Sequence, residues 1–317
     1  MTTLKEIKGQ TIQALDTDPS NLGAGQVWYN TTTNKLKITA VSTSGAWASG
    51  GNMGTSRYNL AGAGTQTAGL GIGGMTPSAT NVTEHYDGSA WTSGGNIGTA
   101  RYYLAGCGAD TAALAFGGDD GSNKNYTEEY DGSAWTAGGN LGTARYRLAG
   151  AGTQTAGLAF GGYDDDLLNA TEHYDGSAWT SGGNMGTARY NLAGAGTQTA
   201  GLAFGGYSPH NATEEYDGSA WTSGGNLGTG RQHLGGAGTQ TAGLAFGGYG
   251  GSPTTNATEH YDGSAWTAGG NMGTGREYMG DAGTLSAGLA FGGAVGGSTA
   301  TEEYAGPGFT TQTVTSS

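Results

Sequence analysis

One glutamate and one arginine recur in every copy of a repeated unit, and they are the first residues whose types and spacing suggest chemistry. The glutamates are Glu84, Glu128, Glu172, Glu214, Glu259 and Glu302, and the arginines are Arg57, Arg101, Arg145, Arg189, Arg231 and Arg276. A catalytic centre needs asymmetry, which six equivalent carboxylates do not provide. Guanidinium and carboxylate groups form strong, directional hydrogen bonds when they pair. We therefore predict six structural ion pairs, one in each copy, and no catalytic residues among them.

A second set of positions changes from copy to copy, and it predicts a recognition surface. The second residue after each arginine is Asn59, Tyr103, Arg147, Asn191, His233 or Tyr278. The connections after the second predicted strand also vary, and their polar members include Asp119, Asp120, Asp164, Asp165 and His210. In an up-and-down four-stranded sheet both sets lie on the same rim. Diversity confined to one rim is typical of a binding surface; free drift of surface loops is the alternative explanation.

The residue after each glutamate alternates between histidine and glutamate. The series is His85, Glu129, His173, Glu215, His260 and Glu303. Duplication of a two-copy ancestor explains the alternation. The alternative hypothesis is that these side chains face outward and contact a three-fold partner, with a pH dependence near the ordinary histidine pKa of about 6.5.

No motif for a metal, a nucleotide or a nucleophile accompanies these residues. The acidic stretches at 119–120 and 164–166 offer oxygen ligands for Ca²⁺, but without EF-hand spacing we expect solvated loops. The patterns GxSxG, HExxH and GxxxxGK[ST] are absent. Cys107 is the single cysteine and stands where other copies carry alanine, so we expect a small buried side chain. The sequence thus predicts no cofactor, no metal site and no enzymatic activity.

The elements that position these residues come from a repeat of about 44 residues. It is marked by Trp47, Trp91, Trp135, Trp179, Trp221 and Trp266. In the copy after Arg145 we expect strands over 146–152, 155–161, 170–174 and 178–181, with a tight turn at Asp175-Gly176. No helical period appears. Closure of six glycine-rich, four-stranded blades into a ring would hide their edges.

Alternation within one strand indicates how the blades pack. In the second strand of that copy Ala156, Leu158 and Phe160 share one face, whereas Gly157 and Ala159 share the other. A bulky face on one blade can then pack against a slim face on the next, which gives the taper that a ring requires.

Charge and hydropathy exclude two classes of partner. The chain has 317 residues, 12 basic residues and a net charge of −13, without a lysine or arginine cluster, so nucleic-acid phosphate would be repelled. It has no run of eighteen apolar residues, and its first residues do not resemble a signal peptide. We expect a soluble chain made in the cytoplasm, with no nucleic-acid binding and no membrane insertion.

Residues 45 to 310 resemble the kelch repeat. Gly161-Gly162, Tyr174 and Trp179, with their counterparts in the other copies, follow the kelch order of paired glycines, tyrosine and tryptophan. The resemblance implies an all-β fold: a six-bladed kelch-like β-propeller with four antiparallel strands per blade. The last copy departs from the pattern at 305–309, so we expect the two chain ends to meet in one blade, with either end supplying its outer strand.

The first 35 or so residues resemble the leader segments of phage tail and tail-fibre proteins, through a DP...G..WYNTT...LK pattern that includes Asp18, Trp28 and Asn30. The alternative interpretation of this stretch is an N-terminal hairpin that packs on the ring. We predict an attachment arm and hairpin at 1–44 and a propeller at 45–317. The resemblance implies a virion structural protein made in the host cytoplasm. Its arm would bind other virion proteins, and its rim would bind a host receptor glycan or another virion protein. The alternatives are a purely architectural decoration protein and a carbohydrate-active enzyme.

Overall fold

The computed structural model describes residues 12–19, 26–42, 44–251, 254–294 and 297–314, and every regular element in those ranges is a β-strand. The prediction of an all-β chain is confirmed. Two compact units are present, one formed by Met1–Gly45 with Pro307–Ser317 and the other by Ala46–Gly306. Within the described ranges no helix is long and apolar enough to cross a bilayer.

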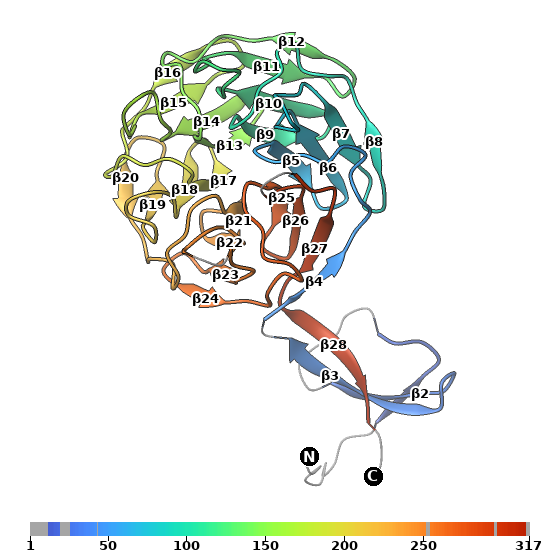
Figure 1. Cartoon of the computed structure of the whole chain (residues 1–317). Coiled ribbons are helices and arrows are strands. Elements are labelled where there is room, and N and C mark those ends of the chain that lie inside the picture. The colour runs from blue at the N-terminus through green and yellow to red at the C-terminus, as the bar shows by residue number, and fades with distance from the viewer. Residues whose placement is uncertain (1–11, 20–25, 43, 252–253, 295–296, 315–317) are drawn as a thin grey trace. The chain divides into compact units, whose positions relative to one another are not determined.

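The larger unit consists of six four-stranded antiparallel sheets, one per sequence repeat (Figure 1). The first strands are β5 (Ala61–Thr65), β9 (Ala105–Ala109), β13 (Ala149–Thr153), β17 (Ala193–Thr197), β21 (Gly235–Thr239) and β25 (Gly280–Thr284). The second strands are β6 (Ala68–Ile72), β10 (Ala112–Phe116), β14 (Ala156–Phe160), β18 (Ala200–Phe204), β22 (Ala242–Phe246) and β26 (Ala287–Phe291). The third strands are β7 (Thr83–Tyr86), β11 (Thr127–Tyr130), β15 (Thr171–Tyr174), β19 (Thr213–Tyr216), β23 (Thr258–Tyr261) and β27 (Thr301–Ala305). The fourth strands are β8 (Trp91–Ser93), β12 (Trp135–Ala137), β16 (Trp179–Ser181), β20 (Trp221–Ser223), β24 (Trp266–Ala268) and β4 (Ala46–Ser49).

The sheets are arranged around a central axis, with their first strands innermost (Figure 1). Each first strand lies beside the first strand of the next repeat, and β25 lies beside β5. Residues of all six first strands line a channel along the axis. This arrangement is consistent with a β-propeller.

The strand β4 joins the two ends of the larger unit. It pairs antiparallel with β27, so that Trp47 lies opposite Tyr304. The Trp47 indole packs on Phe246 with ring centroids 4.9 Å apart, and its Nε1–H donates to Thr258 Oγ1 at 2.9 Å. The N-terminal side of the repeat region therefore supplies the outer strand that the sequence left undecided.

We expect Trp47→Ala to lower the free energy of unfolding by about 3 kcal/mol, the lower end of the range for large aromatic truncations, because the indole is half-buried. The loss should match that of Trp135→Ala, which removes the equivalent indole from a sheet built from one continuous stretch of chain. Urea unfolding of both variants measures this. A negligible loss for Trp47→Ala beside a large one for Trp135→Ala would show that β4 does not close the unit.

The first strand of each repeat begins later than the sequence predicted. In the copy after Arg145 the strands cover 149–153, 156–160, 171–174 and 179–181, whereas we expected the first to start at 146. Arg147 has a φ of +56°, which is incompatible with an extended strand.

The predicted two-residue turn at Asp175-Gly176 is a four-residue loop, 175–178. The Asp175 carboxylate caps it by accepting hydrogen bonds from the backbone N–H groups of Ser177 and Ala178, each at 2.8 Å.

Packing between sheets follows the predicted pairing of bulky and slim faces. Leu158 and Phe160 of β14 are fully buried in a cluster that includes Ala203 and Tyr216 of the next sheet. A Cβ atom on Gly201 would lie 2.7 Å from Leu158 Cδ2, so this position favours a small residue, and the second repeat carries Ala113 there. Cys107 is buried in the neighbouring cluster, and burial raises the pKa of its thiol to about 12, which keeps it protonated and inert.

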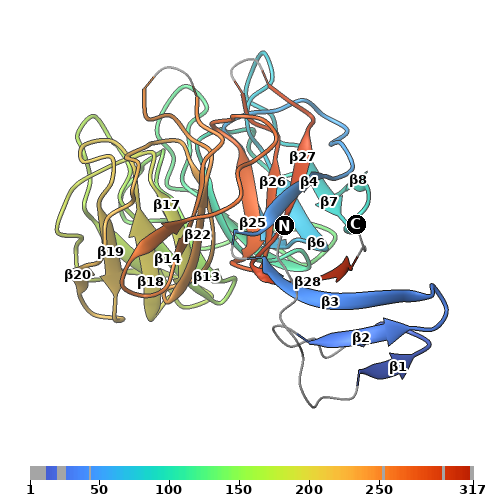
Figure 2. The same cartoon turned by 90° about the horizontal axis from the view of Figure 1, so that it is seen from below.

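The smaller unit is a four-stranded sheet in the order β1-β2-β3-β28 (Figure 2). Its strands are β1 (Gln13–Leu15), β2 (Val27–Asn30), β3 (Lys35–Ser42) and β28 (Gly308–Thr313). The expected hairpin is present as β2 and β3. The C-terminal segment, which the sequence analysis assigned to the propeller, instead pairs antiparallel with β3. Within the predicted attachment arm and hairpin at 1–44, residues 1–11, 20–25 and 43 lie outside the described residues.

Candidate functional site

Six residues from the six repeats surround one end of the axial channel, and we call them the axial ring. They are Asn59, Tyr103, Arg147, Asn191, His233 and Tyr278, with φ values of 54°, 54°, 56°, 57°, 55° and 60°. Asparagine and histidine adopt this left-handed conformation more readily than other residues, but tyrosine and arginine adopt it rarely. Strained backbone at equivalent places in a fold is a feature that points to function.

A closed circle of backbone hydrogen bonds holds the axial ring. Each residue donates its N–H to the carbonyl of its counterpart in the preceding repeat. The donors are Tyr103 to Asn59 (2.9 Å), Arg147 to Tyr103 (2.9 Å), Asn191 to Arg147 (2.9 Å), His233 to Asn191 (2.9 Å), Tyr278 to His233 (3.2 Å) and Asn59 to Tyr278 (2.8 Å). The circle fixes six equivalent backbone positions and leaves their side chains free to differ.

The axial-ring side chains line a hollow of about 90 Å³, which we call the mouth. Its remaining walls are Leu60, Leu104, Leu148, Leu192, Leu234 and Met279. A concave, mostly apolar site with a few convergent polar groups is the usual form of a small-ligand pocket.

Arg147 is the cation of the mouth. Its guanidinium carbon lies 4.4 Å from the centre of the Tyr103 ring and 5.4 Å from that of Tyr190, and its Nη2 donates to the Tyr103 hydroxyl at 3.2 Å. Its Nε is buried without a hydrogen-bond partner, and no carboxylate pairs with it among the described residues. Stacking on aromatic faces therefore holds a guanidinium whose charge is not neutralised by an acid.

His233 is held as a neutral imidazole. Its side chain is 9% exposed, and its Nδ1 lies 3.1 Å from Glu277 Oε2. Burial and the charge of Arg147 lower the pKa of His233 to about 3, so Nδ1–H donates to the carboxylate as a neutral hydrogen bond instead of forming an ion pair. Its Nε2 is then a hydrogen-bond acceptor, and it has no partner among the described residues.

The two asparagines of the axial ring differ in their hydrogen-bond partners. Asn191 donates from Nδ2 to Gln232 Oε1 at 3.1 Å. Asn59 is 6% exposed, and its Oδ1 is buried without a partner in the described part of the chain. The mouth thus contains two unpaired acceptors, Asn59 Oδ1 and His233 Nε2, and one unpaired donor, Arg147 Nε–H.

Aromatic rings continue from the mouth toward the connections between the second and third strands, and we call them the aromatic arc. Successive centroids from Tyr103 through Tyr146, Tyr163, Tyr190 and Tyr207 to His210 are 5.9, 5.7, 5.4, 5.1 and 5.6 Å apart. Tyr207 is 42% exposed at the outer end. The arc joins the two variable sets that the sequence placed on one rim.

The acidic connections lie beside the arc. Two of these connections form backbone bridges to the residues that directly precede axial-ring residues in the sequence. The bridges are Tyr102–Asp119 and Tyr146–Tyr163. Most of the carboxylates there make local contacts: Asp119 accepts from the Gly121 N–H at 2.8 Å, Asp120 pairs with Lys124 at 2.7 Å, and Asp164 accepts from the Asp166 N–H at 3.4 Å. No group of three metal-ligating side chains occurs among the residues that the structure describes.

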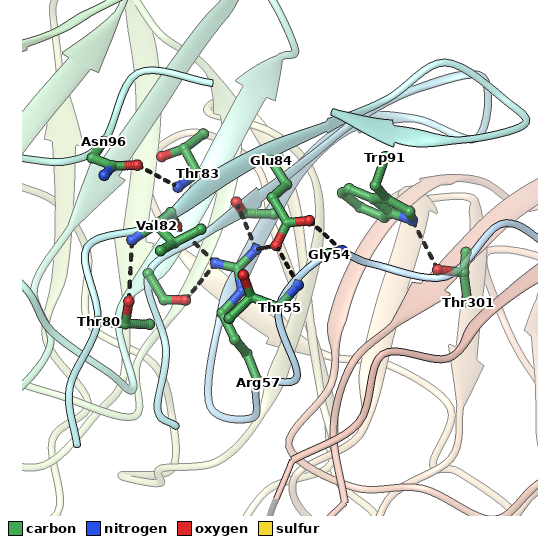
Figure 3. Close-up of polar contacts among 12 residues, drawn as sticks. Gly54, Thr55, Arg57, Thr80, Val82, Thr83, Glu84, Trp91, Asn96 and Thr301 are labelled. Atoms are coloured by element: carbon green, nitrogen blue, oxygen red, sulfur yellow. Dashed lines mark hydrogen bonds and ion pairs between the residues drawn. The ribbon is translucent and has the colours of Figure 1, made fainter. Parts of the chain in front are cut away.

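The six arginine–glutamate pairs are buried, and both partners of each pair come from the same repeat. Their Nη2–Oε1 distances are 3.0 Å for Arg57–Glu84, 3.0 Å for Arg101–Glu128, 2.9 Å for Arg145–Glu172, 3.0 Å for Arg189–Glu214, 3.0 Å for Arg231–Glu259 and 2.7 Å for Arg276–Glu302. Figure 3 shows the first pair: Glu84 also accepts from the Gly54 N–H at 2.6 Å, and Arg57 donates to the carbonyl of Val82. Burial lowers the pKa of Arg57 to about 10, well above neutrality, so the guanidinium stays charged.

The alternating histidines and glutamates form hydrogen bonds between neighbouring sheets. All but the buried His260 are partly exposed, so contact with a three-fold partner stays a prediction. Each is hydrogen-bonded to the tyrosine hydroxyl of the next repeat. The pairs are His85–Tyr130, Glu129–Tyr174, His173–Tyr216, Glu215–Tyr261, His260–Tyr304 and Glu303–Tyr86. Both side-chain types serve because a tyrosine hydroxyl can donate to either an imidazole nitrogen or a carboxylate.

One carboxylate lies in the channel below the mouth. Asp281 stands where the other repeats have glycine, and it accepts a hydrogen bond from the Gly236 N–H at 2.9 Å. Its side chain is half-buried where it borders the channel, and this burial raises its pKa to about 7. The sequence analysis missed Asp281, and also Glu277. Comparison of the six copies could have identified both, since each is the one acidic residue at its position.

Neither a protein-family model nor a curated protein matches the chain. The kelch and phage resemblances therefore remain predictions from the residues themselves.

Proposed function

We propose that the chain is a six-bladed, kelch-like β-propeller whose axial face binds a ligand without transforming it. The axial ring carries this proposal. Six equivalent backbone positions are fixed by one circle of hydrogen bonds, while their side chains include an arginine, a histidine, two tyrosines and two asparagines. A rigid backbone that presents dissimilar, partly unpaired side chains suits recognition.

We further propose that the protein is a phage virion component of the tail or tail fibre, made in the host cytoplasm, and that the smaller unit attaches it to other virion proteins. The leader pattern supports this, because its residues are hydrogen-bonded to one another within that unit. The Asp18 carboxylate accepts from Trp28 Nε1 at 3.0 Å and from Asn30 Nδ2 at 2.8 Å. The ligand of the axial face is then a host receptor glycan or another virion protein. A purely architectural role is the alternative.

A second candidate function is carbohydrate-active catalysis at the mouth, and the His233–Glu277 pair favours it. Such a buried pair is a possible acid–base group. Glycoside hydrolysis ordinarily uses two carboxylates on either side of the bond, however, and Glu277 is the one carboxylate that contacts the described axial ring. Binding is therefore the better-supported function.

The test is a glycan array probed with the intact protein. We expect a defined subset of glycans to bind, and Tyr103→Asn to weaken binding at least ten-fold, since it removes one aromatic wall of the mouth. Asparagine already occupies two ring positions, so the backbone tolerates this change. Lys124→Gln, on the same rim but outside the mouth, is the matched control and should bind normally. No binding to any glycan or virion protein would favour the architectural role, and turnover of a polysaccharide that Tyr103→Asn abolishes would favour catalysis.

A further inference from the structure

We propose that the mouth binds one acidic sugar residue, with its carboxylate on Arg147 and its hydroxyls on Asn59 and His233. This inference rests on the proposed binding function and specifies the ligand class.

Arg147 indicates that the ligand carries a carboxylate. The protein carries a net charge of −13, yet the mouth holds a guanidinium that no described acid neutralises. The Tyr103 and Tyr190 rings lie beside the guanidinium and its Nε is buried, and this partial removal from water strengthens its attraction for an anion. Its Nε–H has no acceptor, and a carboxylate supplies one with the planar geometry that guanidinium prefers.

The two unpaired acceptors indicate that the ligand also carries hydroxyl groups. Asn59 is 6% exposed and the His233 side chain 9% exposed, so neither Asn59 Oδ1 nor His233 Nε2 is compensated by bulk solvent. An unpaired buried acceptor costs free energy that a ligand O–H recovers. Because the imidazole is neutral and donates its Nδ1–H to Glu277, its Nε2 can only accept. A ligand therefore needs donors as well as a carboxylate, and a carboxylated sugar has both.

The size and surroundings of the mouth also fit one sugar residue. A hollow of about 90 Å³ equals the volume of roughly three waters, which accommodates a carboxylate and an adjacent hydroxyl while the rest of the ring lies above. Tyr103 and Tyr278, whose ring centroids are 6.1 Å apart, both line the mouth and give it an aromatic wall against which sugar C–H groups can pack. The acidic connection at 164–166 next to the arc would repel a polyanion, so we expect a single acidic residue followed by neutral ones.

The experiment is a titration of the full-length, ¹⁵N-labelled protein at pH 7 with three matched probes, followed by backbone amide shifts. The probes are D-glucuronate, D-glucose, which lacks the carboxylate, and cyclohexanecarboxylate, which lacks the hydroxyls. We expect glucuronate to bind at least ten-fold more tightly than either of the others, with shifts centred on the axial ring. Arg147→Asn should weaken glucuronate binding at least ten-fold, whereas Lys124→Gln, which removes a cation outside the mouth, should leave it unchanged.

Three results would overturn the inference. They are equal affinity for glucose and glucuronate, equal affinity for cyclohexanecarboxylate and glucuronate, and full glucuronate affinity in Arg147→Asn. Arg147→Asn reproduces the residue at positions 59 and 191, and an amide spectrum that retains the native dispersion establishes that it folds. If neutral glycans bind on the array while glucuronate does not bind the mouth, the proposed binding function stands and this ligand class is wrong.

Discussion

Replacing Asp281 by glycine is expected to stabilise the protein at pH 8 and to remove a loss of stability that the wild type suffers between about pH 4 and pH 7. Burial raises the pKa of Asp281 from 3.8 to about 7, against the smaller opposing effect of the Gly236 N–H. In this window the folded state keeps a proton that the unfolded state has released, so the free energy of unfolding falls as pH rises. The full shift of about 3 units corresponds to at most about 4 kcal/mol above pH 7.

Glycine is the matched replacement because the other five repeats carry it at this position. Its flexibility offsets the gain by roughly 0.5–1 kcal/mol. Asp281→Asn keeps the shape of the side chain without its charge and serves as a second variant. Urea unfolding at pH 5 and pH 8 measures the effect. Parallel pH dependences in the wild type and both variants would mean that Asp281 is not buried in the channel as described.

Breaking one buried ion pair gives the other large expected effect. Glu172→Gln should lower the free energy of unfolding by about 3–5 kcal/mol, because it leaves the fully buried Arg145 guanidinium without a counter-charge. Arg145 Nη1 also donates to the carbonyls of Gly161 at 3.1 Å and Ala170 at 2.8 Å, so the arginine cannot swing out to water without breaking these contacts.

The control is the Lys124–Asp120 pair, which lies at the surface of a connection. Lys124→Gln should cost less than about 1 kcal/mol, as surface pairs usually do. The double variant Arg145→Met/Glu172→Leu should recover part of the stability lost in Glu172→Gln, because no buried charge is left without a counter-charge. Recovery is incomplete because the Gly161 carbonyl and the Gly142 N–H lose their side-chain partners. A loss below about 1 kcal/mol for Glu172→Gln would contradict the burial of the pair.

Local patterns made much of the fold predictable. The tryptophan spacing defines the repeat, the alternation in 156–160 distinguishes the bulky face from the slim one, and the single arginine and glutamate of each copy indicate the buried pairs. Each of these signals lies within about 45 residues of chain and recurs six times, so accidental matches are averaged out.

Features that depend on distant contacts were not predictable. The pairing of β28 with β3 joins segments at opposite ends of the chain, and nothing in either segment specifies the other. The left-handed conformation of Arg147 is imposed by the circle of backbone hydrogen bonds, not by a local glycine or asparagine signal. The variable positions were identified from the sequence, but their convergence on one mouth depends on how all six sheets pack.

The most direct test of this account is an experimental electron-density map of the full chain. We expect six four-stranded sheets around one channel, with Asn59, Tyr103, Arg147, Asn191, His233 and Tyr278 surrounding a single mouth and linked by one closed circle of backbone hydrogen bonds. An open arrangement of the sheets, a different number of them, or axial-ring side chains separated onto different faces would contradict it.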